Sequence, residues 1–389
     1  MSSSSLPLRV VVLPLLVISV AQIAGCTPRP AAAPPGGTYY SQSAGALFEQ
    51  TVTLRDDERT TNIASFSLQR AHRPPHSPQT IYIAAGAQGI IRSDDGGGSW
   101  VRLTTPLTFV SDVVALANGV IITAGTTGEG QGFVIRTIDD GHSWDVALAI
   151  PLPLDTRQWQ IIRAPEAPDP RVISIELDPF NADRIYAGSS LGSIFVGEQS
   201  GKTWRTEYTL QASTLVGGNR QGLSIRNIIP SPHRAGELLL LTSTHTLLRV
   251  TPTTQEELLI PRDLKNPGAL SFTNRKRVFD VTFVQDFPQA LMVGVDDGAV
   301  ISRDNGESWE QLALPLDQFQ SFNTTAVAVS PTNFTRMLVA INSVVFRSED
   351  GGKTWQTFSL NLPNHGVTAL LIDPENPANI LIVTTPIRT

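Results

Sequence analysis

The sequence predicts an all-β protein built from repeated four-stranded units. An octapeptide, Ser348-Glu349-Asp350-Gly351-Gly352-Lys353-Thr354-Trp355, recurs along the chain of 389 residues. The 30 glycines and 28 prolines, with only 16% charged residues, favour many short strands and turns. Val- and Ile-rich runs end at Gly, Pro or Asn, and no long stretch has helical periodicity.

The octapeptide follows the pattern S/T-x-D-x-G-x-S/T-W and is typical of a tight turn between strands. Asp bonds nearby backbone amides, Gly accepts a positive φ, and Trp anchors the start of the next strand. Further copies are Ser93–Trp100, Thr137–Trp144 and Ser302–Trp309, and a worn copy, Gly197–Trp204, has Gln199 in place of Asp. We therefore assign structural roles to Asp95, Gly97, Trp100, Asp139, Gly141, Trp144, Gly201, Trp204, Asp304, Gly306, Trp309, Asp350, Gly352 and Trp355.

Each unit supplies four antiparallel strands. In one unit, the strand Val172–Leu177 leads through the turn Asp178–Asn181 to a second strand, Arg184–Gly188. A third strand enters the octapeptide, and a fourth begins at its Trp. Four antiparallel strands per repeat are typical of the blade of a β-propeller.

The spacing of the repeats predicts the number of blades. The octapeptide tryptophans are 44, 60, 105 and 46 residues apart. The longest gap holds a blade without an octapeptide, with strands at Ser224–Ile229, Leu238–Leu241 and Thr246–Val250, and with Thr251–Thr254 as its turn. After Trp355, Val367–Ile372 and Ile380–Val383 form half a blade, for which we expect Ala46–Leu54 to provide the outer strand. Closure by both termini removes exposed sheet edges. We predict seven blades, with six as the alternative.

The octapeptides resemble Asp-box repeats, also called BNR repeats. Such repeats occur in sialidases, sortilin-type receptor domains, some glucan hydrolases and photosystem II assembly factors. The whole chain most resembles the last group, which has one seven-bladed propeller, is often lipidated and carries an arginine-rich patch. The resemblance implies that the octapeptides lie on the outer hairpins, away from a binding face, and a shared fold does not by itself fix the function.

The N-terminus predicts a membrane anchor. Residues 1–25 are expected to be a lipoprotein signal peptide, because Val10–Val20 is apolar but too short to span a bilayer as a mature helix. Ile23-Ala24-Gly25-Cys26 resembles a lipobox, so we expect lipidation of Cys26, with an ordinary signal peptide as the alternative. Residues 26–38 then form a Pro/Ala-rich tether and residues 39–389 the propeller. These features predict a protein anchored in the bacterial cell envelope. Since Cys26 is the only cysteine, an internal disulfide and a Cys-based zinc cluster are excluded.

Long loops on the face opposite the octapeptides carry many cations. These loops are Pro151–Pro170, Gln211–Leu223 and Ile260–Lys276. A basic face on a chain of net charge −6 would attract a protein partner with an acidic segment, or a carboxylate-bearing ligand. The expected binding residues are Arg157, Trp159, Arg163, Arg220, Arg262, Arg275, Lys276 and Arg277. In the alternative, the cations are solvated around the rim and Trp159 packs its loop.

Enzyme motifs are scarce. The sequence has no Gly-rich phosphate loop and no HExxH zinc motif, and no G-x-S-x-G nucleophile elbow stands out between a strand and a helix. The closest match to the Arg-Ile-Pro motif of sialidases is Ile162–Pro165, and it follows the second octapeptide. The pairs Glu166/Asp169 and Asp296/Asp297 match a two-carboxylate glycosidase by residue type alone. We expect a monomeric, non-catalytic binding or assembly scaffold without cofactor, metal or nucleic acid. The alternative is a glycoside hydrolase with a degenerate motif set.

Overall fold

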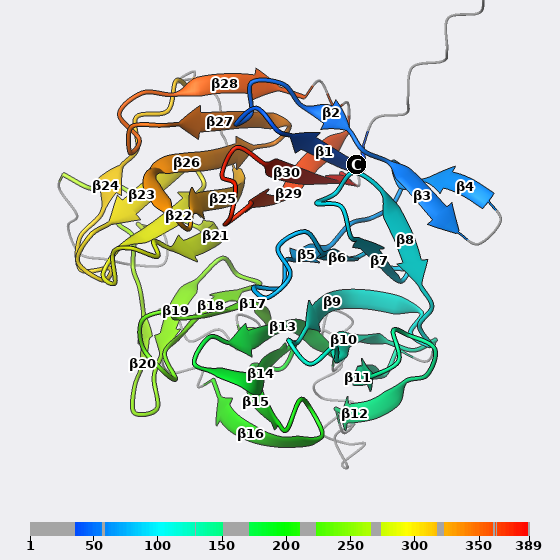
Figure 1. Cartoon of the computed structure of the whole chain (residues 1–389). Coiled ribbons are helices and arrows are strands. Elements are labelled where there is room, and N and C mark those ends of the chain that lie inside the picture. Colours follow the sequence, from blue (N-terminus) through cyan, green and yellow to red (C-terminus); the bar gives the residue numbers. More distant parts are fainter. Residues whose placement is uncertain are drawn as a thin grey trace, which may run out of the picture. The chain divides into compact units, whose positions relative to one another are not determined.

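Seven sheets form the computed structural model of the protein, six of them wholly antiparallel (Figure 1). The structure describes residues 36–56, 59–128, 130–150, 171–210, 223–265, 274–316, 323–360, 362 and 364–387. These residues belong to one compact unit, Pro35–Thr389.

The strands follow one another in blades of four. The first blade contains β5 (Arg70–His72), β6 (Ile81–Ala84), β7 (Ile90–Ser93) and β8 (Trp100–Leu103). The second contains β9 (Phe109–Ala115), β10 (Ile121–Thr126), β11 (Gly132–Thr137) and β12 (Asp145–Ala149). The third contains β13 (Val172–Asp178), β14 (Asn181–Ser189), β15 (Ser193–Glu198) and β16 (Thr203–Thr209). The fourth contains β17 (Ile225–Pro230), β18 (Leu238–Thr242), β19 (Leu247–Val250) and β20 (Gln255–Glu257).

The remaining blades have the same order. The fifth contains β21 (Val278–Phe283), β22 (Leu291–Val295), β23 (Gly298–Ser302) and β24 (Glu310–Gln311). The sixth contains β25 (Thr324–Ser330), β26 (Asn333–Ile341), β27 (Val344–Ser348) and β28 (Gln356–Ser359). The seventh combines β29 (His365–Ile372) and β30 (Ile380–Pro386) with β1 (Thr38–Ser41) and β2 (Glu49–Gln50).

The blades close into a ring, and the fold is the predicted seven-bladed β-propeller. The first strand of each blade lies innermost, and β29 of the last blade contacts β5 of the first (Figure 1). The fourth blade lacks the octapeptide, as expected, and a bond from the amide of Thr251 to the carbonyl of Thr254 closes its turn. Among the described residues, no helix has the length and apolarity needed to cross a membrane.

Both termini close the ring as predicted, but the N-terminal part supplies two strands of the last blade instead of one. The third strand of the seventh blade is β1, which pairs with β30 from Thr38 opposite Val383 to Ser41 opposite Ile380. Only β2 of the predicted segment Ala46–Leu54 reaches the edge of this blade. The segment then leaves the seventh blade, because β3 (Thr53–Asp56) pairs in parallel with β8 and antiparallel with β4 (Arg59–Asn62). The N-terminal strands therefore join the first and last blades.

The four complete octapeptides form one kind of turn between the third and fourth strands. The leading hydroxyl donates to Oδ1 of the Asp over 2.7–2.8 Å and accepts from the Gly amide over 2.7–3.0 Å. In all four copies the amide before Trp donates to the same Oδ1 over 2.9 Å. Hydrogen bonds to Oδ2 from the hydroxyls of Ser143 and Thr354, together with these bonds, lower the pKa of Asp139 and of Asp350 to about 2. Gly352 has a φ of 88°, which explains the need for glycine.

The hydrophobic core consists of layers between neighbouring blades. One layer packs Val114 and Ile122 of the second blade against Ile175 and Ile185 of the third. Another packs Trp100 and Leu54 against Leu381 and Val383 of the seventh blade. Of the octapeptide tryptophans, Trp100 is fully buried and the other four are partly buried. Because the apolar side chains pack between blades, the inner strands are free to present polar groups to the centre.

Candidate binding cavity at the centre of the ring

A register shift places extra side chains at the centre. In six of the seven inner strands the pairing skips one residue at the same point, as between Val278 and Asp280 in β21. Such a bulge turns consecutive side chains toward the same region. The residues that follow the skipped position are Asp112, Ser174, Asn227, Asp280, Ala326 and Ala369. Arg70 occupies the matching position of β5, which has no skip.

Three of these side chains each bond the backbone of the next blade. Oδ2 of Asp112 accepts from the amide of Ile175 over 2.9 Å, and Oγ of Ser174 accepts from the amide of Ile228 over 3.1 Å. Oδ2 of Asp280 accepts from the amide of Val327 over 2.8 Å. Buried amides need such acceptors. The carboxylates of Asp112 and Asp280 are therefore parts of the ring's structure.

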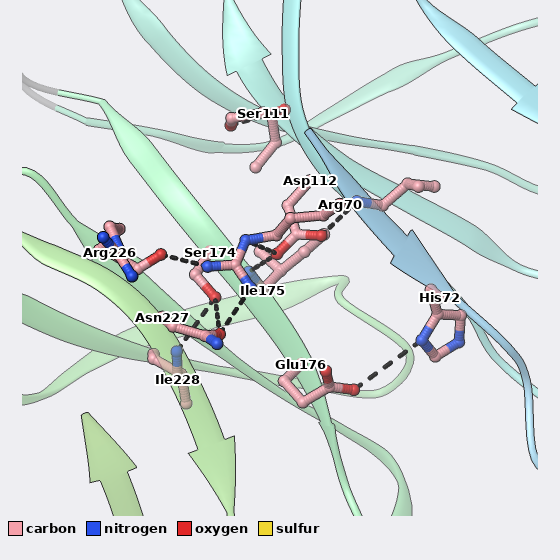
Figure 2. Close-up of polar contacts among 12 residues, drawn as sticks. Arg70, His72, Ser111, Asp112, Ser174, Ile175, Glu176, Arg226, Asn227 and Ile228 are labelled. Carbon is pink, nitrogen blue, oxygen red and sulfur yellow. Dashed lines mark hydrogen bonds and ion pairs between the residues drawn. The ribbon is translucent and has the colours of Figure 1, made fainter. Parts of the chain in front are cut away.

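Arg70 crosses the centre of the ring. Figure 2 shows its side chain reaching from β5 past Asp112 to β17. Its Nη1 donates to Oδ1 of Asn227 over 2.6 Å, and its Nη2 donates to the carbonyl oxygen of Arg226. Its Nε lies 3.6 Å from Oδ2 of Asp112. A single cation thus joins strands of the first, second and fourth blades.

Two cavities meet at Arg70. One has a volume of about 710 Å³ and is bordered by Thr126, Arg171, Asn323 and Asn342, on the side opposite the octapeptides. The other, of about 660 Å³, lies among the turns that join the first and second strands of the blades, on the octapeptide side. Arg70, Ala71, His72, Glu176 and Asn227 line both cavities. The two cavities therefore adjoin at Arg70, and together they are called the channel.

The charges in the channel are strongly perturbed. Burial raises the pKa of Asp112 to about 6, although Arg70 opposes the shift. Burial, and then the charge of Asp112, raise the pKa of Glu176 to about 7. Glu176 keeps 40% of its side-chain surface open and lines both cavities. Nδ1 of His72 lies 3.9 Å from Oε1 of Glu176, and burial lowers the pKa of His72 to about 4. Burial also raises the pKa of Asp280.

The predicted basic face is only partly described. Arg157, Trp159, Arg163 and Arg220 lie outside the described residues, as do Glu166, Asp169 and Cys26. Arg262 and Arg277 are half exposed, and both contact Oδ2 of Asp296, at 3.0 and 3.4 Å. The guanidinium of Arg277 also stacks on Phe279 of the cavity wall.

Arg275 and Lys276 lie inside the protein instead of on its surface. Arg275 donates to Oε1 of Glu257 over 2.6 Å and to Oγ1 of Thr246 over 2.8 Å. The ammonium of Lys276 contacts Asp297. Both cationic side chains are buried because their positions precede β21, where the chain enters the blade. Asp296 and Asp297 likewise serve ion pairs, and neither lines the central cavity.

Four residues of the channel were not predicted from the sequence: Arg70, Asp112, Glu176 and Arg226. An available signal was the acidic residue in otherwise apolar first strands, as in Phe109–Ala115 and Val278–Phe283. This signal could not be interpreted from the sequence, because the position of the bulge determines which residues of the strand face the channel. Among the described residues, no group of three or more His, Cys, Asp and Glu side chains is arranged to hold a metal ion.

The comparisons with known proteins reveal the fold alone. Neither a family model nor a curated protein sequence matches the chain. Among solved structures, a GH74 xyloglucanase from Xanthomonas campestris matches 83% of this chain with a TM-score of 0.63 and 15% identity. The match covers 51% of the xyloglucanase, so this chain spans about half of that enzyme.

Two solved structures of YCF48 also match this chain, and the matches cover nearly the whole length of YCF48. YCF48 bound to a D1 peptide has a TM-score of 0.55 and 18% identity, and the match covers 84% of this chain and 93% of YCF48. YCF48 from Cyanidioschyzon merolae has a TM-score of 0.55 and 16% identity, with 82% and 96% covered. These likenesses support a single propeller of ordinary size.

Proposed function

We propose that the protein is a non-catalytic scaffold that binds an acidic segment of a partner protein in the central cavity, on the face opposite the octapeptides. The observation that carries the proposal is the cavity of about 710 Å³ with Arg70 and Arg226 at its base and Arg171 in its wall. Arginine suits this purpose because it stays charged and binds carboxylates through a planar fork. The volume lies within the range of about 300–1,000 Å³ of ordinary ligand sites.

The engagement of the carboxylates favours binding over hydrolysis. A two-carboxylate glycosidase needs one group to protonate the leaving oxygen and another to act as nucleophile or base. In the channel, Asp112 and Asp280 each accept a hydrogen bond from a backbone amide of the next blade. Glu176 alone has an open surface and a pKa near neutrality. The hydrolase alternative rests on Glu176 and on the likeness to the GH74 xyloglucanase.

Two further features support the scaffold. The solved structure of YCF48 with a D1 peptide is an example of a propeller of this size that binds a protein segment. The shared hydrogen bonds of the four turns support placing the chain among Asp-box propellers. In our proposal, the lipidated Cys26 and its Pro/Ala-rich tether keep the protein at a membrane of the bacterial cell envelope.

Site-specific photocrosslinking tests the binding face. A photoreactive residue at Asn323, which is exposed at the cavity border, should capture a protein partner in intact cells. The same residue at Lys353, in an octapeptide turn, should capture little. Arg171→Glu should reduce capture at Asn323, whereas Lys202→Glu, on the octapeptide side, should not. Equal capture at both positions, or hydrolysis of xyloglucan that Glu176→Gln abolishes, would refute the scaffold.

A further inference from the structure

The hydrogen bonds of Arg70 leave its charge weakly compensated. Its two directed bonds go to neutral oxygens, of Asn227 and of the Arg226 backbone. Both carboxylate oxygens of its ion partner Asp112 accept hydrogen bonds from backbone amides. Oδ2 accepts one from Ile175, and Oδ1 accepts one from Val113 over 2.9 Å. Arg70 therefore has no carboxylate of its own in a forked pair, which is the strongest arrangement for a guanidinium.

A second guanidinium lies beside it. Nη2 of Arg226 donates to the carbonyl oxygen of Phe279, and the charge of Arg70 helps to lower the pKa of Arg226 after the larger effect of burial. Both side chains line the cavity. Two neighbouring cations without a forked carboxylate form a site where an anion would be stabilised.

We propose that Arg70 and Arg226 form a proton-linked oxyanion site, in which a carboxylate of the ligand takes over the countercharge that Asp112 and Glu176 supply in the free protein. The inference rests on the proposed function, since the same cavity receives the partner segment. It adds the residues that recognise the acidic group and the condition under which they do so.

The other charges around the site set the direction of the pH dependence. Charged groups come from β9 (Asp112), from β13 and its start (Glu176 and Arg171), from β17 (Arg226) and from β21 (Asp280). The described lining residues of β25 and β29 carry no charge, and His72 on β5 stays neutral above about pH 4. At pH 8, three carboxylates balance three arginines. As the pH falls through about 7 and about 6, Glu176 and Asp112 take up protons and the arginines lose two countercharges.

Linkage gives the sign of the effect. A bound anion raises the pKa of Glu176 and of Asp112, so binding takes up protons. By reciprocity, acidification strengthens anion binding. One linked proton changes affinity by up to about tenfold per pH unit between its free and bound pKa values.

Titration of the full-length protein with sulfate tests the site, because sulfate stays a dianion from pH 5.5 to pH 8. Calorimetry should show binding about tenfold tighter at pH 5.5 than at pH 8, with proton uptake between pH 6 and pH 7. Glu176→Gln should tighten binding at pH 8 and flatten the pH dependence. Glu310→Gln, on the exposed outer strand β24, is the matched control and should behave like the parent. Arg226→Gln should weaken binding at both pH values.

The opposite results overturn the inference. Equal affinity at the two pH values, absence of sulfate binding at millimolar concentration, or an unchanged pH profile in Glu176→Gln would each do so. If capture at Asn323 succeeds while the sulfate results fail, only the proton-linked site is wrong. If sulfate binds with proton uptake but Asn323 captures no partner, the scaffold is wrong and the oxyanion site stands.

Discussion

Truncation of Trp100 measures how strongly the first and last blades are held together. Trp100 begins β8, is fully buried, and packs with Leu54, Leu381 and Val383. Its Nε1 donates to the Thr38 hydroxyl and to the Thr51 carbonyl, both over 3.1 Å. Trp100→Ala should lower the free energy of unfolding by about 3–5 kcal/mol, the usual loss for a buried aromatic side chain. Trp100→Phe keeps most of the packing and loses the hydrogen bonds, which costs about 1 kcal/mol.

Trp355 provides the comparison. It immediately precedes β28, the fourth strand of the sixth blade, and is partly buried, and its Nε1 donates within its own turn to the carbonyl of Gly352 over 3.1 Å. Trp355→Ala should therefore cost less, roughly 1–3 kcal/mol. Urea unfolding monitored by circular dichroism measures the free energy of unfolding of all three variants. Equal losses for Trp100→Ala and Trp355→Ala would show that the contacts of Trp100 across the closure add nothing to the free energy of unfolding.

Three further predictions address closure, the basic loop and the anchor. Deleting residues 36–50 should lower the melting temperature and promote aggregation, because β30 becomes an open edge; an unchanged melting temperature would contradict the closure. Arg275→Gln should cost about 3–5 kcal/mol because it breaks the buried ion pair with Glu257, whereas Arg277→Gln should cost under about 0.5 kcal/mol; similar urea midpoints would refute this distinction. Cys26→Ser should shift the protein from membranes to the soluble envelope fraction, and retention on membranes in high salt would rule out lipid anchoring.

Local patterns predicted most of the propeller. The octapeptide fixes a turn through bonds among its own residues, so each copy locates a third and a fourth strand. Alternating apolar runs located the inner strands, including β17 in the blade without an octapeptide. The spacing of the tryptophans then limited the blade count, because every blade must fill a similar share of the ring.

The closure was harder to predict because it depends on contacts distant in sequence. The strand β1 contains only Thr-Tyr-Tyr-Ser and follows a Pro/Gly-rich segment, so its own pattern is weak. Its position is fixed by β30, more than 300 residues away along the chain. The predicted outer strand Ala46–Leu54 contains β2 and only the start of β3, and β3 pairs with β8 of the first blade. The sequence pattern indicated extended structure there and left the strand bounds and neighbours undetermined.

The candidate site escaped prediction because a repeat protein gains a site where its repeats differ. The seven matching inner positions hold charged or polar residues in the first five blades but Ala326 and Ala369 in the last two. No single blade contains the site, and each of its residues is unremarkable within its own strand. The ring brings Arg70 to Asn227, 157 positions further along the chain. The charged side of the cavity therefore faces an uncharged side, where Val327, Val367 and Thr368 line the wall. In our proposal, a segment that fits both sides carries its acidic group next to uncharged side chains, so the order of residues in the partner matters as much as its charge.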